Sequence, residues 1–121
     1  MKKKKPIWKA NPEKHDYPAA IDYLSLLFDN ITVKKMITEL KETKTIYKKA
    51  KDLRRACGNI PILKANDPHV RENLKKIEKG ELLSPCLFIR HNNILICADG
   101  FHRLSTIYYT NYDLDIPCRI I

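Results

Sequence analysis

The part of the sequence most suited to chemistry is the motif Asp-Gly-Phe-His-Arg at residues 99–103, which directly follows a run of apolar residues. An apolar strand that leads into a helix here would leave the first backbone amides of that helix free, and such amides bind phosphate. Gly100 has no side chain to block an approaching phosphate oxygen. Arg103, in the first turn, can hold the same oxygens through two parallel hydrogen bonds. The motif therefore predicts a phosphate site at the start of a helix.

Two other residues of the motif could act on a bound phosphate ester. His102 can donate a hydrogen bond to phosphate or exchange a proton near neutral pH. Asp99, at the end of the strand, can hold Mg²⁺ on the ligand, act as a base or orient His102. The alternative interpretation is a plain strand–glycine–helix turn, in which Asp99 caps the helix and Arg103 forms a surface ion pair. The local pattern leaves both interpretations open.

The rest of the chain predicts the elements that position this motif in a single mixed α/β (α+β) domain. Residues 1–14 are expected to form a basic arm, and residues 15–121 one domain, with a helical hairpin over 15–43 and an α/β core over 44–121. Turn residues and apolar spacing divide the core into alternating elements. The expected strands are 45–47, 85–90, 94–98 and 116–121, and the expected helices are 51–57, 68–79 and 100–111.

The expected hairpin rests on two caps and on the spacing of apolar residues. Asp16 is expected to cap its first helix and Thr32 its second. Apolar residues then recur at intervals of three and four, which predicts one buried face on each helix. The expected buried residues are Ile21, Leu24, Leu27 and Phe28 in the first helix and Val33, Met36, Ile37 and Leu40 in the second.

Composition and charge favour some classes of protein and exclude others. The 121 residues carry a formal net charge of +9, and residues 1–60 hold 15 Lys and Arg against 7 Asp and Glu. A basic half suggests contact with a polyanion such as nucleic acid.

No apolar run approaches the length of about 18 residues that a membrane helix needs, and no apolar stretch follows Lys2–Lys5 as in a signal peptide. We therefore expect a cytoplasmic protein that does not span a membrane. The four cysteines and four histidines lack the spacing of a structural zinc site.

From residue 62 to residue 121 the chain resembles the ParB/sulfiredoxin superfamily. The resemblance rests on four pieces in the same order and at similar spacing. Residues 66–71, Asn-Asp-Pro-His-Val-Arg, are similar to the Asn-Pro…Pro-Arg box of ParB. Residues 76–87 are similar to the stretch that ends in Pro-Ile-Val, and residues 99–103 to the Asp-Gly-His-His-Arg variant of free-serine kinases. The last piece is the closing strand at residues 115–120.

The resemblance implies a small mixed sheet with helices and a nucleotide site. In that superfamily the Gly-x-x-Arg helix start binds the phosphates of ATP, ADP or CTP. The expected cofactor here is therefore Mg²⁺ with one of these nucleotides. The matching residues here are Gly100, Phe101, His102 and Arg103, with Asn66, His69 and Arg71 as further ligand contacts. Sulfiredoxin has a catalytic Cys where this chain has Phe101, which argues against sulfiredoxin activity. The DNA-binding and dimer domains of a complete ParB clamp do not occur in this sequence.

Three functions follow from these observations. The first is a nucleotide-binding enzyme of phosphoryl chemistry, either an NTPase or a small-molecule kinase, with Asp99, His102 and Asp67 as the catalytic residues and Asp99 as the Mg²⁺ ligand. The second is a non-catalytic module that binds nucleic acid or a protein through the basic N-terminal half. The third is a ParB-like nuclease, which ranks lowest because a two-metal nuclease needs several converging carboxylates.

Overall fold

The computed structural model describes residues 4–121 and confirms a mixed α+β fold. Residues 1–3, which include part of the predicted basic arm, lie outside the described residues. The elements in chain order are β1 (Ile7–Trp8), α1 (Asp16–Leu24), α2 (Asn30–Glu42), β2 (Ile46–Lys49), α3 (Ala50–Ala56), α4 (Pro68–Lys79), β3 (Leu82–Leu83), β4 (Cys86–His91), β5 (Ile94–Asp99), α5 (Phe101–Asn111) and β6 (Asp115–Ile120).

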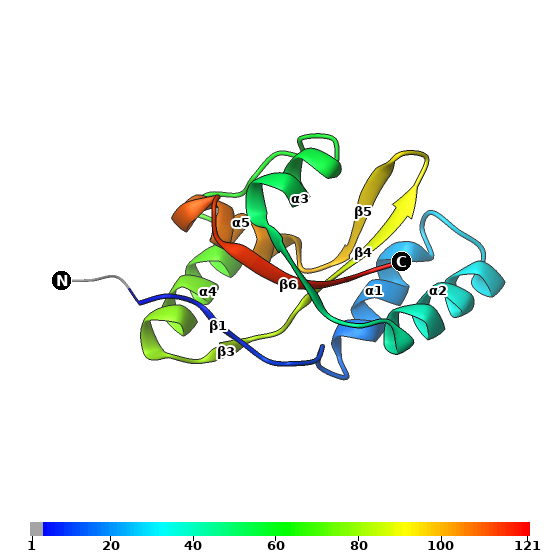
Figure 1. Cartoon of the computed structure of the whole chain (residues 1–121), viewed down its shortest axis with the longest axis horizontal. Helices are drawn as coiled ribbons and strands as arrows, with labels where there is room; N and C mark the ends of the chain where they lie inside the picture. Colours follow the sequence, from blue (N-terminus) through cyan, green and yellow to red (C-terminus); the bar gives the residue numbers. More distant parts are fainter. Residues whose placement is uncertain (1–3) are drawn as a thin grey trace.

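The main sheet has four strands in the order β2-β6-β4-β5 (Figure 1). The central pair, β6 and β4, is parallel, and the two outer pairs are antiparallel. Asn92 and Asn93 both adopt positive φ angles, which lets a two-residue turn join β4 to β5. A separate parallel pair joins β1 to β3, so residues 7–8, in the middle of the predicted arm, are bound to the segment before β4.

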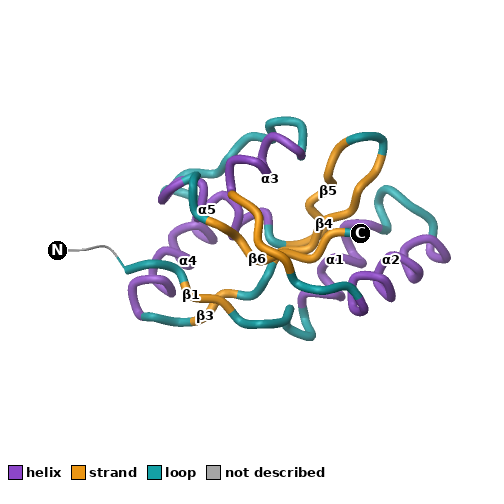
Figure 2. The backbone as a smooth tube through the Cα atoms, in the orientation of Figure 1, coloured by secondary structure: helices purple, strands orange, loops and turns teal. Residues whose placement is uncertain are grey.

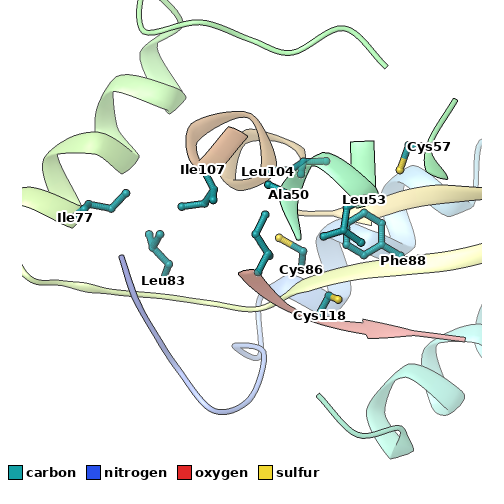
Figure 3. Close-up of a cluster of buried hydrophobic side chains, with 11 residues drawn as sticks. Ala50, Leu53, Cys57, Ile77, Leu83, Cys86, Phe88, Leu104, Ile107 and Cys118 are labelled. Atoms are coloured by element: carbon teal, nitrogen blue, oxygen red, sulfur yellow. The ribbon is translucent and has the colours of Figure 1, made fainter. Parts of the chain in front are cut away.

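Helices lie on both sides of the sheet (Figure 2), and β4 has buried side chains on each of its two faces. Its side chains alternate between two buried clusters, as the pleat of a strand requires. Cys86 and Phe88 contact the cluster under α3, α4 and α5, which Figure 3 shows. Leu87 and Ile89 contact the cluster under α1 and α2. The parallel centre of the sheet is therefore buried on both faces.

Local signals set the bounds of α4, one of the two helices beside the candidate motif. The carboxylate of Asp67 accepts hydrogen bonds from the amides of His69 and Val70, and Pro68 is the first helical residue. Gly80 ends the helix with a φ of 75°, a conformation that glycine adopts without strain. The predicted helix between Pro68 and Gly80 is confirmed.

The predicted hairpin forms, but two details were wrong. Asp29, not Thr32, caps α2, because its carboxylate accepts the amide of Thr32 at 2.8 Å. α1 ends at Leu24, with Ser25 as its C-cap, so the apolar face predicted to extend to Phe28 does not continue. Leu27 is therefore exposed instead of buried, and Ile21 is also exposed. Among the described residues, no helix is long and apolar enough to cross a membrane.

Candidate functional site

The junction of β5 and α5 brings the motif of residues 99–103 to one end of the sheet. Asp99 is the last residue of β5, and Gly100 is the N-cap of α5. The first α-helical hydrogen bond runs from the amide of Leu104 to the carbonyl of Gly100 at 2.8 Å. The amides of the three residues between them therefore have no partner within the helix. The predicted strand–glycine–helix arrangement is confirmed.

Gly100 is required by conformation and by a close contact. Its φ of 109° lies in the region that favours glycine. A Cβ atom at this position would lie 2.5 Å from Sγ of Cys86 and 3.1 Å from Nη2 of Arg103. The space beside this glycine is thus filled by the protein, and the thiol of Cys86 donates to the carbonyl of Gly100 at 3.6 Å. Burial raises the pKa of the Cys86 thiol, so it stays neutral at pH 7.

We expect Gly100→Ala to lower the free energy of unfolding by about 2–5 kcal/mol, because backbone strain and overpacking act together. Gly58→Ala is the matched control. Gly58 also has a positive φ, of 77°, but a Cβ there would meet no atom within 4 Å, so only the strain of about 1–2 kcal/mol applies. Urea unfolding of both variants measures the difference. Equal losses would show that the contact with Cys86 does not constrain position 100.

Asp99 and Arg103 form an ion pair inside the site. Nη2 of Arg103 lies 2.8 Å from Oδ2 of Asp99, and the two side chains are only 17% and 16% exposed. The same nitrogen donates to the carbonyl of Pro85 at 3.3 Å. Nε of Arg103 is buried and has no hydrogen-bond partner in residues 4–121. The guanidinium is therefore fixed by the hydrogen bonds of Nη2, whereas Nε makes no hydrogen bond.

A second carboxylate, Asp16 of α1, lies beside this pair and was not expected there. Asp16 is 2% exposed and accepts the amide of Glu13 at 2.9 Å. The prediction that it caps α1 was wrong, because His15 occupies the N-cap and the Asp16 side chain turns inward. Burial raises the pKa of Asp99, the facing Arg103 opposes that rise, and the neighbouring Asp16 adds to it. Two buried carboxyl groups therefore face one guanidinium.

The imidazole of His102 packs against that of His69 from α4, with ring centroids 4.4 Å apart. Burial lowers the pKa of His102, and the neighbouring His69 lowers it further. His102 is therefore mainly neutral at pH 7 and can accept a proton. The sequence named both residues, but only packing of α4 on α5 shows that their rings meet.

Two cavities open at this junction, and their linings differ. The first has a volume of about 200 Å³, and every residue that lines it is polar or glycine. The second has a volume of about 520 Å³ and is lined mainly by apolar residues of β5 together with Tyr23, Cys57 and Ile60. Both cavities share Asp99, Gly100 and His102. The polar cavity is completed by His69, Glu72, Asn73, Lys76 and Arg103.

The remaining predicted site residues lie around the start of α4. Asp67 uses its carboxylate as the helix cap, and it is close enough to His102 to oppose the lowering of that residue's pKa. Asn66 and Arg71 are exposed and do not line the polar cavity. Lys76 and Glu72 do line it and were not singled out from the sequence. The signal that could have found them is their spacing along the helix. Glu72 is three residues after His69 and Lys76 is four residues after Glu72, so all three lie on one face of the helix.

The chain was compared with protein-family models, curated proteins and solved structures, and none of the three comparisons found a match.

Proposed function

We propose that this domain binds a nucleotide, with the phosphates in the polar cavity at the start of α5. The observation that carries the proposal is the convergence of cationic and donor groups on that cavity. Lys76 and Arg103 line it, as do the imidazoles of His69 and His102. The free amides of the first turn of α5 add the partial positive charge of a helix N-terminus.

Arg103 lines the polar cavity with a guanidinium that is already fixed in place. The ion pair with Asp99 holds the guanidinium so that little side-chain entropy is lost on binding.

The apolar cavity supports a nucleotide over inorganic phosphate. It borders the polar cavity, with which it shares three lining residues. Its volume of about 520 Å³ lies in the range of small-molecule sites, and its apolar lining suits a ring.

The proposed reaction transfers the terminal phosphoryl group of the bound nucleotide to a hydroxyl or to water: the acceptor oxygen bonds to phosphorus, the bond from phosphorus to the bridging oxygen breaks, and the shortened nucleotide leaves. His102, neutral at pH 7, accepts a proton from the attacking hydroxyl or water, and the raised pKa of Asp99 makes its carboxylate a stronger base than usual. The described residues contain no group of three or more His, Cys, Asp or Glu that could hold a metal ion. No step here depends on a metal ion.

A thermal-shift panel of ATP, ADP, CTP and GTP tests the proposal. A nucleotide at 100 times its Kd stabilises the folded state by about 2.7 kcal/mol, which is readily measured. Lys76→Gln should weaken binding by about 1.5–3 kcal/mol, because a charge-assisted hydrogen bond is lost.

Lys79→Gln is the control, since Lys79 lies on the same helix, is exposed and does not line the cavity. Equal nucleotide-induced shifts in wild type and Lys76→Gln would contradict the assignment of the phosphates to this cavity.

A further inference from the structure

The helical hairpin of α1 and α2 exposes an unusual number of apolar side chains. Twelve large apolar side chains are exposed in the part of the chain that the structure describes, and five of them lie in residues 21–31. Leu26 and Ile31 are the two most exposed of the twelve, at 80% and 71%. The two helices lie side by side at one end of the molecule (Figure 1). Exposed apolar side chains concentrated in one segment indicate an interaction site, whereas single scattered ones do not.

A groove with a volume of about 440 Å³ lies between the two helices. Its lining residues recur at intervals of three and four, so they form one face of each helix. They are Ile21 and Ser25 from α1 and its C-cap, and Asn30, Val33, Lys34, Ile37 and Thr38 from α2. Val33 and Ile37 are buried and the other five are exposed. The groove therefore has an apolar base and opens to the solvent.

Ile31 lies at the rim of this groove. It comes three residues before Lys34 and seven before Thr38, so it is on the same side of α2 as these two lining residues. The hydroxyl of Thr38 already donates to the carbonyl of Lys34 at 3.0 Å, so this hydroxyl is satisfied within the helix. A surface that has a projecting apolar side chain beside an apolar groove can pair with itself, because in a two-fold interface each copy supplies both parts.

The charges of the hairpin also suit a second copy of the chain. The whole chain has a net charge of +9, but residues 18–38 contain two Asp and two Lys and are neutral. These residues are Asp22, Asp29, Lys34 and Lys35, which are all exposed and form no ion pair within residues 4–121. The hydrogen bond from the amide of Thr32 lowers the pKa of Asp29, which is therefore charged at neutral pH. Two neutral faces that carry both signs can meet with opposite charges opposed, whereas two basic faces repel each other.

We propose that the hairpin face, defined here as the groove, Ile31 and the four charged residues, pairs with the same face of a second copy about a two-fold axis. The Ile31 side chain of each copy enters the groove of the other, and the lysines of each copy face the aspartates of the other. Burial of the apolar side chains from water drives the association. No residue of the groove lines either cavity at the junction of β5 and α5, so the dimer forms independently of nucleotide binding.

Sedimentation equilibrium of the full chain over about 1 to 300 µM tests the proposal, because a dimer forms by mass action. The molar mass should rise with concentration from 14.2 kDa towards twice that value. Ile31→Asp should raise the dissociation constant of the dimer at least about 10-fold, since it places a charge in the apolar groove of both copies. Ile31 lies in the first turn of α2, where the helix dipole favours a carboxylate, so the melting temperature of this variant should not fall.

The matched control is Leu82→Asp, which makes the same kind of change at an exposed apolar residue of β3, at the other end of the molecule (Figure 1). This variant should change the dissociation constant less than about threefold, because the residue lies outside the hairpin face.

A charge exchange tests whether opposite charges face each other across the axis. Lys34→Glu/Lys35→Glu makes all four charges of the face negative and should weaken the dimer at least about 10-fold. The control Lys75→Glu/Lys79→Glu makes the same change at exposed positions of α4 and should leave the dimer no weaker. An equimolar mixture of Lys34→Glu/Lys35→Glu with Asp22→Lys should associate more tightly than either variant alone, because faces of opposite charge then meet.

Three results would overturn the proposal. The first is the mass of a single chain at every concentration, which would leave the hairpin face to a different protein. The second is a dimer that Ile31→Asp and Leu82→Asp weaken equally, which would place the contact elsewhere on the molecule. The third is a mixture of the two charge variants that associates no more tightly than its components.

Discussion

Arg103→Met is expected to lower the free energy of unfolding by about 3–5 kcal/mol at pH 7. The substitution leaves Asp99 with a buried charge and no cation, beside the second buried carboxyl of Asp16. Breaking one member of a buried pair costs more than the pair itself contributes, because the remaining charge is desolvated and uncompensated. Urea unfolding measures the loss.

The loss should depend on pH in a defined direction. In the variant the pKa of Asp99 lies further above its unfolded value, so the folded state binds the proton more tightly. The loss in free energy of unfolding caused by Arg103→Met therefore becomes smaller as pH falls through the pKa of Asp99 in the folded variant. The loss becomes larger again as pH rises. Adding Asp99→Asn should recover part of the loss, since it removes the unpaired charge. A loss below about 1 kcal/mol that does not change with pH would contradict the buried ion pair.

The variant Arg103→Lys tests the role of Arg103 in ligand binding separately from its role in stability. Lysine keeps the positive charge that faces Asp99, but it lacks the planar fork of donors that includes the unsatisfied Nε. The variant should keep much of the stability that Arg103→Met loses, yet respond less than wild type to nucleotides in a melting experiment. Equal responses would remove Arg103 from the phosphate site without affecting the fold.

Local features of the sequence predicted the elements around the site well. α4 was predicted from Asp67, Pro68 and Gly80, because caps and breakers act on neighbouring residues. The same holds for the junction of β5 and α5, where the five motif residues 99–103 are consecutive in the chain. Their positions relative to one another follow from the first turn of a helix.

Features that depend on distant parts of the chain were missed. Asp16 was expected to be a cap, but the packing of α1 against β5 buries it beside Asp99. The parallel pairing of β1 with β3 has no periodic signal, since each strand has only two residues. Both depend on tertiary contacts, which propensity and spacing along the chain do not encode. The resemblance to the ParB/sulfiredoxin superfamily stays a prediction.

Arg119 shows how the hairpin that carries Asp16 is held on the sheet. This residue of β6 is only 8% exposed, and its guanidinium donates to five acceptors. Three of them are side-chain atoms from the arm, α1 and the segment before β2, and two are the carbonyls at the end of α2. The contacts are Asn11 Oδ1 at 2.8 Å, Tyr17 Oη at 3.2 Å, Thr45 Oγ1 at 3.2 Å, Leu40 O at 3.1 Å and Lys41 O at 3.0 Å.

We expect Arg119→Met to lower the free energy of unfolding by about 3–5 kcal/mol, because five hydrogen bonds are lost at once and the acceptor on Leu40 is left buried without its donor. The carbonyl end of α2 also loses a cation that the helix dipole favours. Arg119→Lys should recover little, since a single ammonium cannot reach acceptors on four segments. The matched control is Arg90→Met on the neighbouring strand β4, where the side chain is exposed and the change should stay within about 0.5 kcal/mol.

Urea unfolding compares the three variants, and limited proteolysis of Arg119→Met should cut first between the arm and α2. If Arg119→Met lost no more stability than Arg90→Met, the hairpin would have to be held by its apolar cluster alone, and the placement of Asp16 beside Asp99 would not depend on this arginine.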